Sequence, residues 1–508
     1  MDRLDYLKWC RDEKLSERAF KTHRIYDYMP GHVRYQYGRF PARNPYYPTN
    51  DDWKLLDRYA ENGIEMIHLW LWNGECGLFG RDVYEPVNKE GVRRFIDECH
   101  RRRLKVIPYT STGYLDMHSP VYRSEWSRSG RKKNDFNYLD LDILCPGSIG
   151  WRNYFYSAIE RLMDDYGFDG IYWDGGIGLY NPGCFNEKAS DHVHFAEIER
   201  QDAEQQATNF YANVINPDYV DLWNDFLCGV YARARRRRGF VVAHMSGDNL
   251  PPFKDRCWDY QLIGEAKNDI LASIDKTKTV APYIVRFIDW SKLITNYTQK
   301  DFTPKLELVP GLEHFAMACC IPYLQFPWLE DGGFGTENVF NVPGVVYQPG
   351  DYWMAWAKAQ QAKGFNPAMM GGSFVQGRDR FLDYFRVYRQ MTEPNTVLYM
   401  EIKGKNGDCF PGTDGKRRVS IFVNSFLWVA IANLDEKKQE IKIRPLQGSV
   451  SELTVTLNPK TLTVLRYFNL NSLPELIQKS GDSFCVQNTG SVKTYVTGKT
   501  DVVAPILE

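Results

Sequence analysis

The sequence lacks an excess of charge of either sign and lacks any long apolar run. Its 508 residues carry 63 Lys and Arg against 64 Asp and Glu, a formal net charge of −1 at pH 7. A nearly neutral chain has no overall field that would attract nucleic acid or an anionic membrane. No stretch approaches the roughly 20 apolar residues of a membrane-spanning helix, and the first thirty residues carry charges throughout rather than the apolar core of a signal peptide. We therefore expect a soluble protein that binds neither nucleic acid nor membrane.

Several catalytic and metal-binding motifs are also missing. The eleven cysteines are scattered, none is spaced as C-x-x-C, and Cys319 and Cys320 are adjacent, which argues against zinc-ribbon and thioredoxin-type sites. The chain has no G-x-S-x-G nucleophile elbow, no H-E-x-x-H motif and no P-loop. We expect neither a metal nor a cofactor, and we expect mostly reduced, buried thiols.

Aromatic residues, by contrast, are abundant. They make up 15% of the chain, with 14 Trp and 32 Tyr. Trp and Tyr bury large areas and offer flat faces, which suits both thick hydrophobic cores and stacking on sugar rings. At this length one large domain and one smaller domain are expected.

Short apolar runs alternate with longer amphipathic stretches after an irregular first sixty residues, the pattern of βα units and a parallel sheet. Eight units within about 330 residues predict an α/β fold, a (β/α)8 TIM barrel with insertions, one of them a polar segment over 181–214. An open doubly wound sheet is the alternative, but no G-x-G-x-x-G follows a strand. The expected strands are 64–72, 104–109, 138–144, 168–173, 240–243, 260–263, 280–288 and 320–326.

The composition changes near Met391. Alternating or β-branched runs separated by turn residues follow, which predicts an antiparallel β-sandwich. These runs are 419–423, 428–432, 440–444 and 453–457. We therefore divide the chain into a catalytic barrel over 1–390, which includes the irregular N-terminal segment, and a C-terminal β-sandwich over 391–508.

The reactive residues of such a barrel lie at the C-terminal ends of its strands. The strongest candidate there is Asp174, in the stretch G-F-D-G-I-Y-W-D-G-G over 167–176. A helix should end at Gly167, a short apolar strand follows, and the carboxylate stands where that fourth strand ends. Two glycines after Asp174 let a ligand approach the backbone. Asp169, at the other end of the strand, should serve stability; for Asp174 the structural alternative is a helix cap or an ion pair.

This stretch resembles the fourth-strand motif of retaining α-glycosidase barrels, notably the α-glucosidase, α-galactosidase and endo-α-N-acetylgalactosaminidase families. In those families a D-G-(aromatic or aliphatic)-x-x-D stretch presents the nucleophilic aspartate, the place that Asp174 holds. The passage from 138–142 through Pro146 and a helix into this stretch is similar as well. Many α-galactosidases carry a lysine two residues before the nucleophile, where Tyr172 stands here. The resemblance implies a glycoside hydrolase that acts on α-linked sugars.

Glycoside hydrolysis needs a second carboxyl group, roughly 5 Å away in retaining enzymes and roughly 6.5–9.5 Å away in inverting ones. Glu265, after the sixth strand, is the first choice, because the acid/base of the families resembled commonly follows that strand. Apolar neighbours would raise its pKa, as a general acid requires, although Lys267 would oppose that shift. Asp248, after the fifth strand, is the competing candidate. A structural salt bridge is the alternative role for Glu265.

Substrate recognition should use aromatic and polar groups at strand ends. Each aromatic alone is explained as well by packing, and His244 fits a hydrogen-bonded or site-lining residue better than a metal ligand. An oligosaccharide or glycoside is the expected partner. An inverting glycosidase and a non-catalytic carbohydrate-binding protein are the alternatives. The candidate binding residues are Trp72, Asn73, Glu75, Tyr109, Trp173, His244, Arg286, Trp328 and Asp331.

Overall fold

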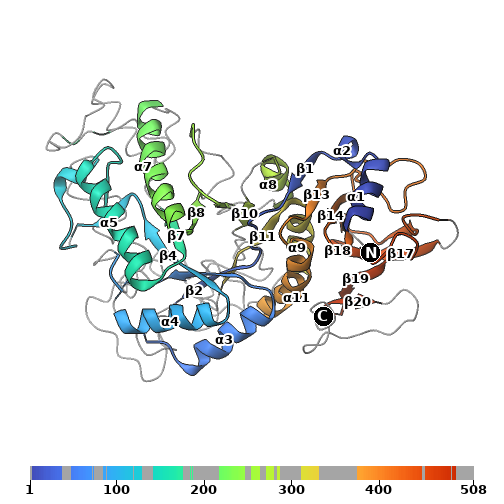
Figure 1. The fold of residues 1–508 in the computed structure, drawn as a ribbon, viewed down its shortest axis with the longest axis horizontal. Helices are drawn as coiled ribbons and strands as arrows, with labels where there is room; N and C mark the ends of the chain where they lie inside the picture. The colour runs from blue at the N-terminus through green and yellow to red at the C-terminus, as the bar shows by residue number, and fades with distance from the viewer. Residues whose placement is uncertain are drawn as a thin grey trace, which may run out of the picture.

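Two large β-sheets, one parallel and one antiparallel, dominate the computed structural model (Figure 1). Only residues 184 and 186 of the predicted insertion over 181–214 are among those the structure describes. The described residues are 3–36, 47–70, 72–73, 84–86, 88–117, 119–128, 141–174, 184, 186, 217–245, 253–263, 270–279, 283–286, 311–330, 375–448, 452–481 and 483–487.

The parallel sheet has the strand order β11-β10-β9-β8-β7-β4-β3-β2-β12. Its two outermost strands, β11 and β12, are separated in the chain only by Trp328. The segment 325–330 therefore pairs with β10 through its first half and with β2 through its second half. The sheet is curled until its two edges meet in one segment. Its strands are β2 (His32–Gln36), β3 (Met66–Trp70), β4 (Lys105–Ser111), β7 (Gly170–Asp174), β8 (Phe240–His244), β9 (Tyr260–Ile263), β10 (Tyr283–Arg286), β11 (Gln325–Pro327) and β12 (Leu329–Glu330).

Helices lie between these strands in the chain, as the βα pattern predicts. None of the helices in the described ranges is long and apolar enough to cross a bilayer. The helices of this part are α3 (Asn50–Glu61), α4 (Lys89–Arg101), α5 (Ile149–Tyr166), α7 (Pro217–Arg236), α8 (Ile270–Thr277), α9 (Leu312–Cys320) and α11 (Val375–Met391).

The passage from helix α5 into strand β7 depends on two glycines. Gly167 ends α5 in the left-handed region, with φ 83°, a conformation that costs glycine little. At Gly170 φ is 150°, and a Cβ atom there would lie 1.9 Å from the carbonyl oxygen of Phe240. Strand β7 therefore approaches β8 so closely at its start that only glycine fits. The helix end and the strand predicted from 167–176 are both confirmed.

The predicted set of barrel strands needs two corrections. The segment 138–144 was expected to be the third strand, but β6 (Leu141–Ile143) pairs antiparallel with β5 (Tyr114–Asp116) in a separate two-stranded sheet. Conversely, β2 lies in the segment that was expected to be irregular, and it pairs with β3 and β12. One strand is lost from the expected barrel and one is gained. The number of strands before Asp174 is therefore unchanged, and β7 is still the fourth strand when counted from β2.

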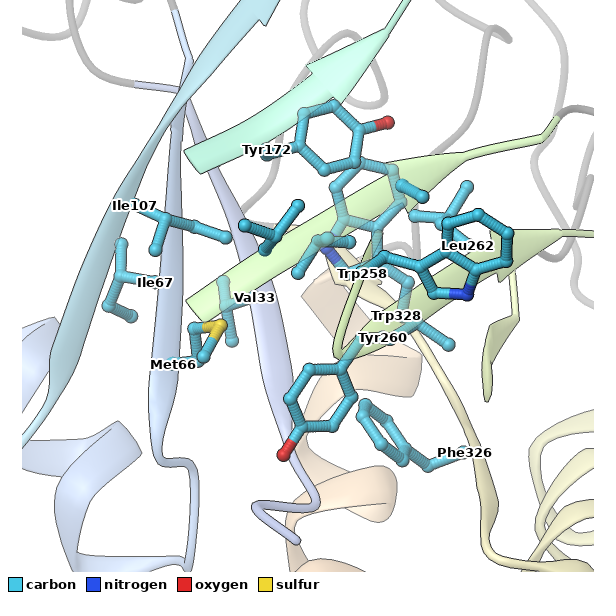
Figure 2. Close-up of a cluster of buried hydrophobic side chains, with 14 of the residues drawn as sticks. Val33, Met66, Ile67, Ile107, Tyr172, Trp258, Tyr260, Leu262, Phe326 and Trp328 are labelled. Carbon is cyan, nitrogen blue, oxygen red and sulfur yellow. The ribbon is translucent and has the colours of Figure 1, made fainter. Parts of the chain in front are cut away.

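Aromatic and histidine side chains fill the interior of the parallel sheet. Figure 2 shows Tyr172, Tyr260, Phe326 and Trp328 gathered between the strands, and all four are buried. His68 lies among them: its Nε2 is 3.0 Å from Nδ1 of His32, and its ring centroid is 5.4 Å from that of Trp328. Burial lowers the pKa of His32 to about 3 and that of His68 well below the usual value, so both rings stay neutral.

The antiparallel sheet has the order β1-β13-β14-β15-β18-β19-β20, and the β16–β17 pair forms a sheet of its own. Strands β15 and β18 are buried along their whole length, because alternate residues face two different cores. Val429 belongs to the cluster shared with Ile441 and Val455 of the β16–β17 pair. Trp428 belongs to the cluster that continues into the parallel part. The strands are β1 (Lys21–Arg24), β13 (Val397–Met400), β14 (Arg417–Val423), β15 (Leu427–Asn433), β16 (Gln439–Ile443), β17 (Leu453–Leu457), β18 (Thr461–Tyr467), β19 (Glu475–Ser480) and β20 (Ser483–Gln487).

The N-terminus packs with this antiparallel sheet rather than with the barrel. Helices α1 (Arg3–Asp12) and α2 (Leu15–Arg18) lie beside it, dark blue next to the orange strands in Figure 1. Strand β1 pairs antiparallel with β13, and Tyr6 and Trp9 lie in the same hydrophobic cluster as Val429. The antiparallel strands predicted after residue 391 are present, but the N-terminal residues that we assigned to the barrel pack on them.

Candidate active site

The carboxylate of Asp174 lies at the C-terminal end of β7, inside the curled sheet. Strand alternation places Asp174 on the same side as Tyr172, whose ring is packed in the sheet interior. The β4–β7 pairing holds the backbone, since the carbonyl oxygen of Asp174 accepts from the N–H of Thr112 at 2.9 Å. The side chain is 20% exposed. Asp174 is thus fixed in position but open to a ligand.

Two neighbouring strands supply hydrogen-bond partners to this carboxylate. The hydroxyl of Tyr109, on β4, donates to Oδ2 of Asp174 at 2.8 Å. On the other side Nδ1 of His244, at the end of β8, lies 3.2 Å from the same oxygen. The hydroxyl of Tyr172 is 2.5 Å from that Nδ1. The four side chains form one network at the ends of β4, β7 and β8.

Tyr109 acts in this network as a neutral donor. Burial raises the pKa of Tyr109 well above its usual value of 10, and the nearby charge of Asp174 raises it further. The phenol therefore keeps its proton at every physiological pH and donates a hydrogen bond to the carboxylate.

A second group of side chains forms the wall beside this network. The guanidinium carbon of Arg34, on β2, lies 3.8 Å from the ring centroid of Trp70 and 5.7 Å from that of Trp328. Trp70 in turn lies 4.1 Å, centroid to centroid, from Tyr109. The positive charge of Arg34 acts on Tyr109 and opposes the rise of its pKa. Cation and aromatic faces thus meet within reach of Asp174.

Sequence reasoning missed Arg34 and its place in the site. Strand β2 lies among proline- and tyrosine-rich flanks that hide its alternation, so no strand end was expected there. The sequence does carry a usable signal there. In His32-Val33-Arg34-Tyr35, polar residues alternate with apolar or aromatic ones, as in a β-strand. Tyr172 was noted only as a departure from a lysine, and its contact with His244 depends on the fold.

Of the predicted ligand contacts, Tyr109, His244 and Trp328 lie in the sheet interior near Asp174. Two others are wrong. Trp173 is fully buried and faces away from Asp174, because successive strand residues alternate. Arg286 donates to the side chains of Gln325, Ser273 and Thr277 at 2.6–2.7 Å, so it holds α8 against the sheet.

Two predicted contacts after β3 have different environments. Trp72 is fully buried, donates from Nε1 to the carbonyl oxygen of Tyr109 at 3.0 Å and lies 5.7 Å, centroid to centroid, from Phe168; this is packing rather than a ligand contact. Asn73 is buried, and its Oδ1 has no hydrogen-bond partner within the described ranges.

The remaining predicted residues lie outside the described part of the chain. They include both candidates for the second carboxyl group, so the structure describes one of the two carboxylates that the chemistry requires. These residues are Glu75, Asp248, Glu265 and Asp331.

Comparison with known proteins gives structural likeness only. No protein-family model matches the chain, and no curated protein sequence matches it. The structure of MutB in complex with the substrate sucrose matches with a TM-score of 0.53 and 10% identity, covering 86% of this chain and 99% of that chain. The α-amylase from Geobacillus thermoleovorans complexed with acarbose matches at 0.52 and 12%, with 86% and 98% covered. Trehalose-6-phosphate hydrolase from Bacillus licheniformis matches at 0.51 and 10%, with 87% and 99% covered.

This chain has the fold of these proteins. The likeness extends over most of each chain, so it includes both the curled parallel sheet and the antiparallel sheet that follows. It agrees with the coarser part of the expected fold class, a curled parallel sheet with helices that is followed by antiparallel strands. At such low identity the likeness establishes the fold alone, and function has to be argued from the site.

Proposed function

We propose that this protein is a glycoside hydrolase that cleaves α-linked glycosides with retention of configuration, and that Asp174 is its nucleophile. The observation that carries the proposal is the Asp174 carboxylate, partly exposed at the C-terminal end of the fourth parallel strand and held by Tyr109 and His244. Active sites of such folds lie at this end of the strands. A nucleophilic aspartate must be aimed at the reacting carbon, and these contacts hold the carboxylate in position.

In this mechanism the carboxylate of Asp174 attacks the anomeric carbon while the bond to the leaving oxygen breaks. A second carboxyl group protonates that oxygen and then activates the water that releases the sugar. Tyr109 and His244 keep Oδ2 of Asp174 in place, which leaves Oδ1 for attack. Arg34, packed on the buried rings of Trp70 and Trp328, adds positive charge beside this site.

The second carboxyl group is Glu265 or Asp248. Asp248 follows the end of β8 by four residues, and Glu265 follows the end of β9 by two. Neighbouring strands lie about 4.8 Å apart. Strand β8, which Asp248 follows, is the neighbour of β7, whereas β9, which Glu265 follows, is one strand further away. A final separation of roughly 5–5.5 Å fits retention and a larger one fits inversion. We retain Glu265 as the first choice because its neighbours in the sequence are apolar, and Asp248 remains the competing candidate.

The structural neighbours suggest the substrates to test first. Their names and bound molecules are α-amylase with acarbose, MutB with its substrate sucrose, and a trehalose-6-phosphate hydrolase. We therefore propose an α-linked glucoside or a related oligosaccharide as substrate. Aryl α-glucosides, sucrose, maltooligosaccharides and trehalose 6-phosphate form the first panel, and the matching β-glycosides serve as controls.

The decisive variant is Asp174→Asn, which keeps the shape of the side chain and removes its charge. We expect kcat to fall by at least about 10³-fold, because the nucleophile is lost, with unchanged unfolding behaviour. NMR of the anomer first released distinguishes retention from inversion. Substantial turnover by Asp174→Asn would exclude Asp174 as nucleophile, and sugar binding without any product on the whole panel would favour a binding protein.

The acid/base is identified by the leaving group. A variant that lacks the general acid still cleaves aryl glycosides whose leaving phenol is acidic, since those need no proton, but it fails on alkyl glycosides. We expect this pattern for Glu265→Gln, and a uniform or small effect for Asp248→Asn. The reverse pattern would assign the role to Asp248.

A further inference from the structure

The outer face of helix α7 holds the segment that leads into strand β9. The carboxylate of Asp221 pairs with the ammonium group of Lys254. The side chain of Asn224 binds the backbone of Asp255 twice: Nδ2 donates to its carbonyl oxygen at 2.8 Å, and Oδ1 accepts from its N–H at 3.0 Å. These contacts dock the segment 253–257 along the helix.

Two cysteines continue this line of contacts. Residues 221, 224 and 228 are spaced three and four apart, so they lie on one face of α7. Seven helical residues rise about 10.5 Å, and the three residues from Lys254 to Cys257 span about 10 Å when extended. Cys257 is therefore brought opposite Cys228, and each thiol affects the pKa of the other.

We propose that Cys228 and Cys257 are an oxidisable pair that forms an intramolecular disulfide in the folded protein. With glutathione disulfide as oxidant, the Cys228 thiolate attacks one glutathione sulfur and the first glutathione leaves as a thiolate. The Cys257 thiolate then attacks the Cys228 sulfur and releases the second glutathione. Two protein thiols are oxidised, one glutathione disulfide is reduced to two thiols, and two protons are released to the thiolates.

The surroundings assign the order of attack. The thiol of Cys228 is partly exposed, whereas Cys257 is buried, so only Cys228 meets an oxidant directly. The Cys228 sulfur also accepts a hydrogen bond from Asn224 Nδ2 at 3.5 Å. The Cys257 thiol lowers the pKa of Cys228, whereas Cys228 raises that of Cys257, which favours the Cys228 thiolate. Burial still raises the pKa of Cys228, with the nearby Asp255 and Asp225 carboxylates adding to it. The reaction should accelerate as the pH rises above neutrality.

A second thiol pair in the structure provides a matched control. Cys184 is likewise near enough to Cys145 to raise the pKa of its thiol, but both cysteines are completely buried. An oxidant reaches neither sulfur in the folded state, so this pair should stay reduced while Cys228 and Cys257 react.

The test is incubation of the reduced, full-length protein with glutathione disulfide at mildly alkaline pH, followed by alkylation and peptide mapping without reduction. We expect the loss of two free thiols and one cross-linked peptide that joins Cys228 to Cys257. The Cys257→Ser variant should instead carry one glutathione on Cys228, and the Cys228→Ser variant should leave Cys257 unmodified.

Other outcomes overturn the proposal. Wild-type protein that keeps both thiols, or that carries glutathione on Cys228 beside a free Cys257, would show that the two sulfurs do not meet. Equal modification of Cys145 and Cys184, or oxidation only in denaturant, would show that the reaction belongs to unfolded chains.

Discussion

Two aspartates, Asp169 and Asp174, stand at opposite ends of strand β7 and differ in every partner. The Asp169 carboxylate receives hydrogen bonds from His100 at 2.7 Å, from Lys105 at 2.8 Å and from the backbone N–H of Val106 at 2.9 Å. The partners of Asp174 are a phenol and an imidazole. The first set contributes cationic and backbone donors that tie strands and helix together. The second set orients a carboxylate and leaves it accessible.

The electrostatics of the two sites follow from these partners. Burial opposes the ionisation of Asp169, but the hydrogen bonds from His100, Lys105 and Val106 outweigh it and lower the pKa of the carboxyl. Asp169 is therefore saturated with donors, as a group that stabilises the fold should be. The comparison teaches that position along a parallel strand, rather than residue type, separates a stabilising carboxylate from the one that we propose as nucleophile.

The same substitution, Asp to Asn, at both ends of β7 tests this difference most directly. Asp169→Asn should lower the free energy of unfolding by about 2 kcal/mol, because hydrogen bonds to a buried charge are lost, while the folded fraction keeps its kcat. Asp174→Asn should do the opposite, with activity lost and stability within about 0.5 kcal/mol of wild type. Urea unfolding and turnover of the two purified variants check this. Equal loss of stability in both would remove the distinction.

A smaller effect is expected at Tyr109. Tyr109→Phe removes the donor to Asp174 but keeps the ring against Trp70, so kcat should fall about 10- to 100-fold with a modest change in stability. Tyr172→Phe, which breaks the contact with His244, is the matched variant and should have the weaker effect. Steady-state kinetics of both variants on the best substrate test this order. A larger loss of kcat in Tyr172→Phe would mean that His244, rather than Tyr109, holds the Asp174 carboxylate in its reactive position.

The smallest expected effect is the pH dependence of the Asp169 contribution. Its folded-state pKa is lowered from the usual 3.8, so the stabilisation is fully present above that value and is lost as the pH falls through the lowered pKa. The difference in unfolding free energy between wild type and Asp169→Asn should therefore be constant from neutrality down to about pH 5 and shrink in stronger acid. The buried His32 and His68 weaken both proteins equally in acid, so they cancel in the difference. A difference that does not change with pH would mean that the charge of Asp169 is unimportant.

Much of this architecture is predictable from local pattern. The helix that ends at Gly167, the strand that ends at Asp174 and the antiparallel runs after residue 391 follow from periodicity and glycine placement. The separate roles of Asp169 and Asp174 follow from the two ends of one strand. Strand β2 was missed because its five residues are flanked by proline and tyrosine, and 138–144 was misplaced because an apolar run does not reveal its partner.

The sequence by itself determined where Asp174, the proposed nucleophile, stands, because a strand's ends and its alternation are local properties of the chain. Tertiary structure alone decided which groups meet there: Arg34 against Trp70, Tyr109 and His244 on one oxygen of Asp174, Trp173 turned away, and Arg286 bound to α8. It also placed the N-terminal strand β1 beside β13. The first residues of these two strands, Lys21 and Val397, are 376 positions apart in the chain. Such contacts join segments far apart in the chain, and they depend on strand order, phase and curvature, which no single segment encodes.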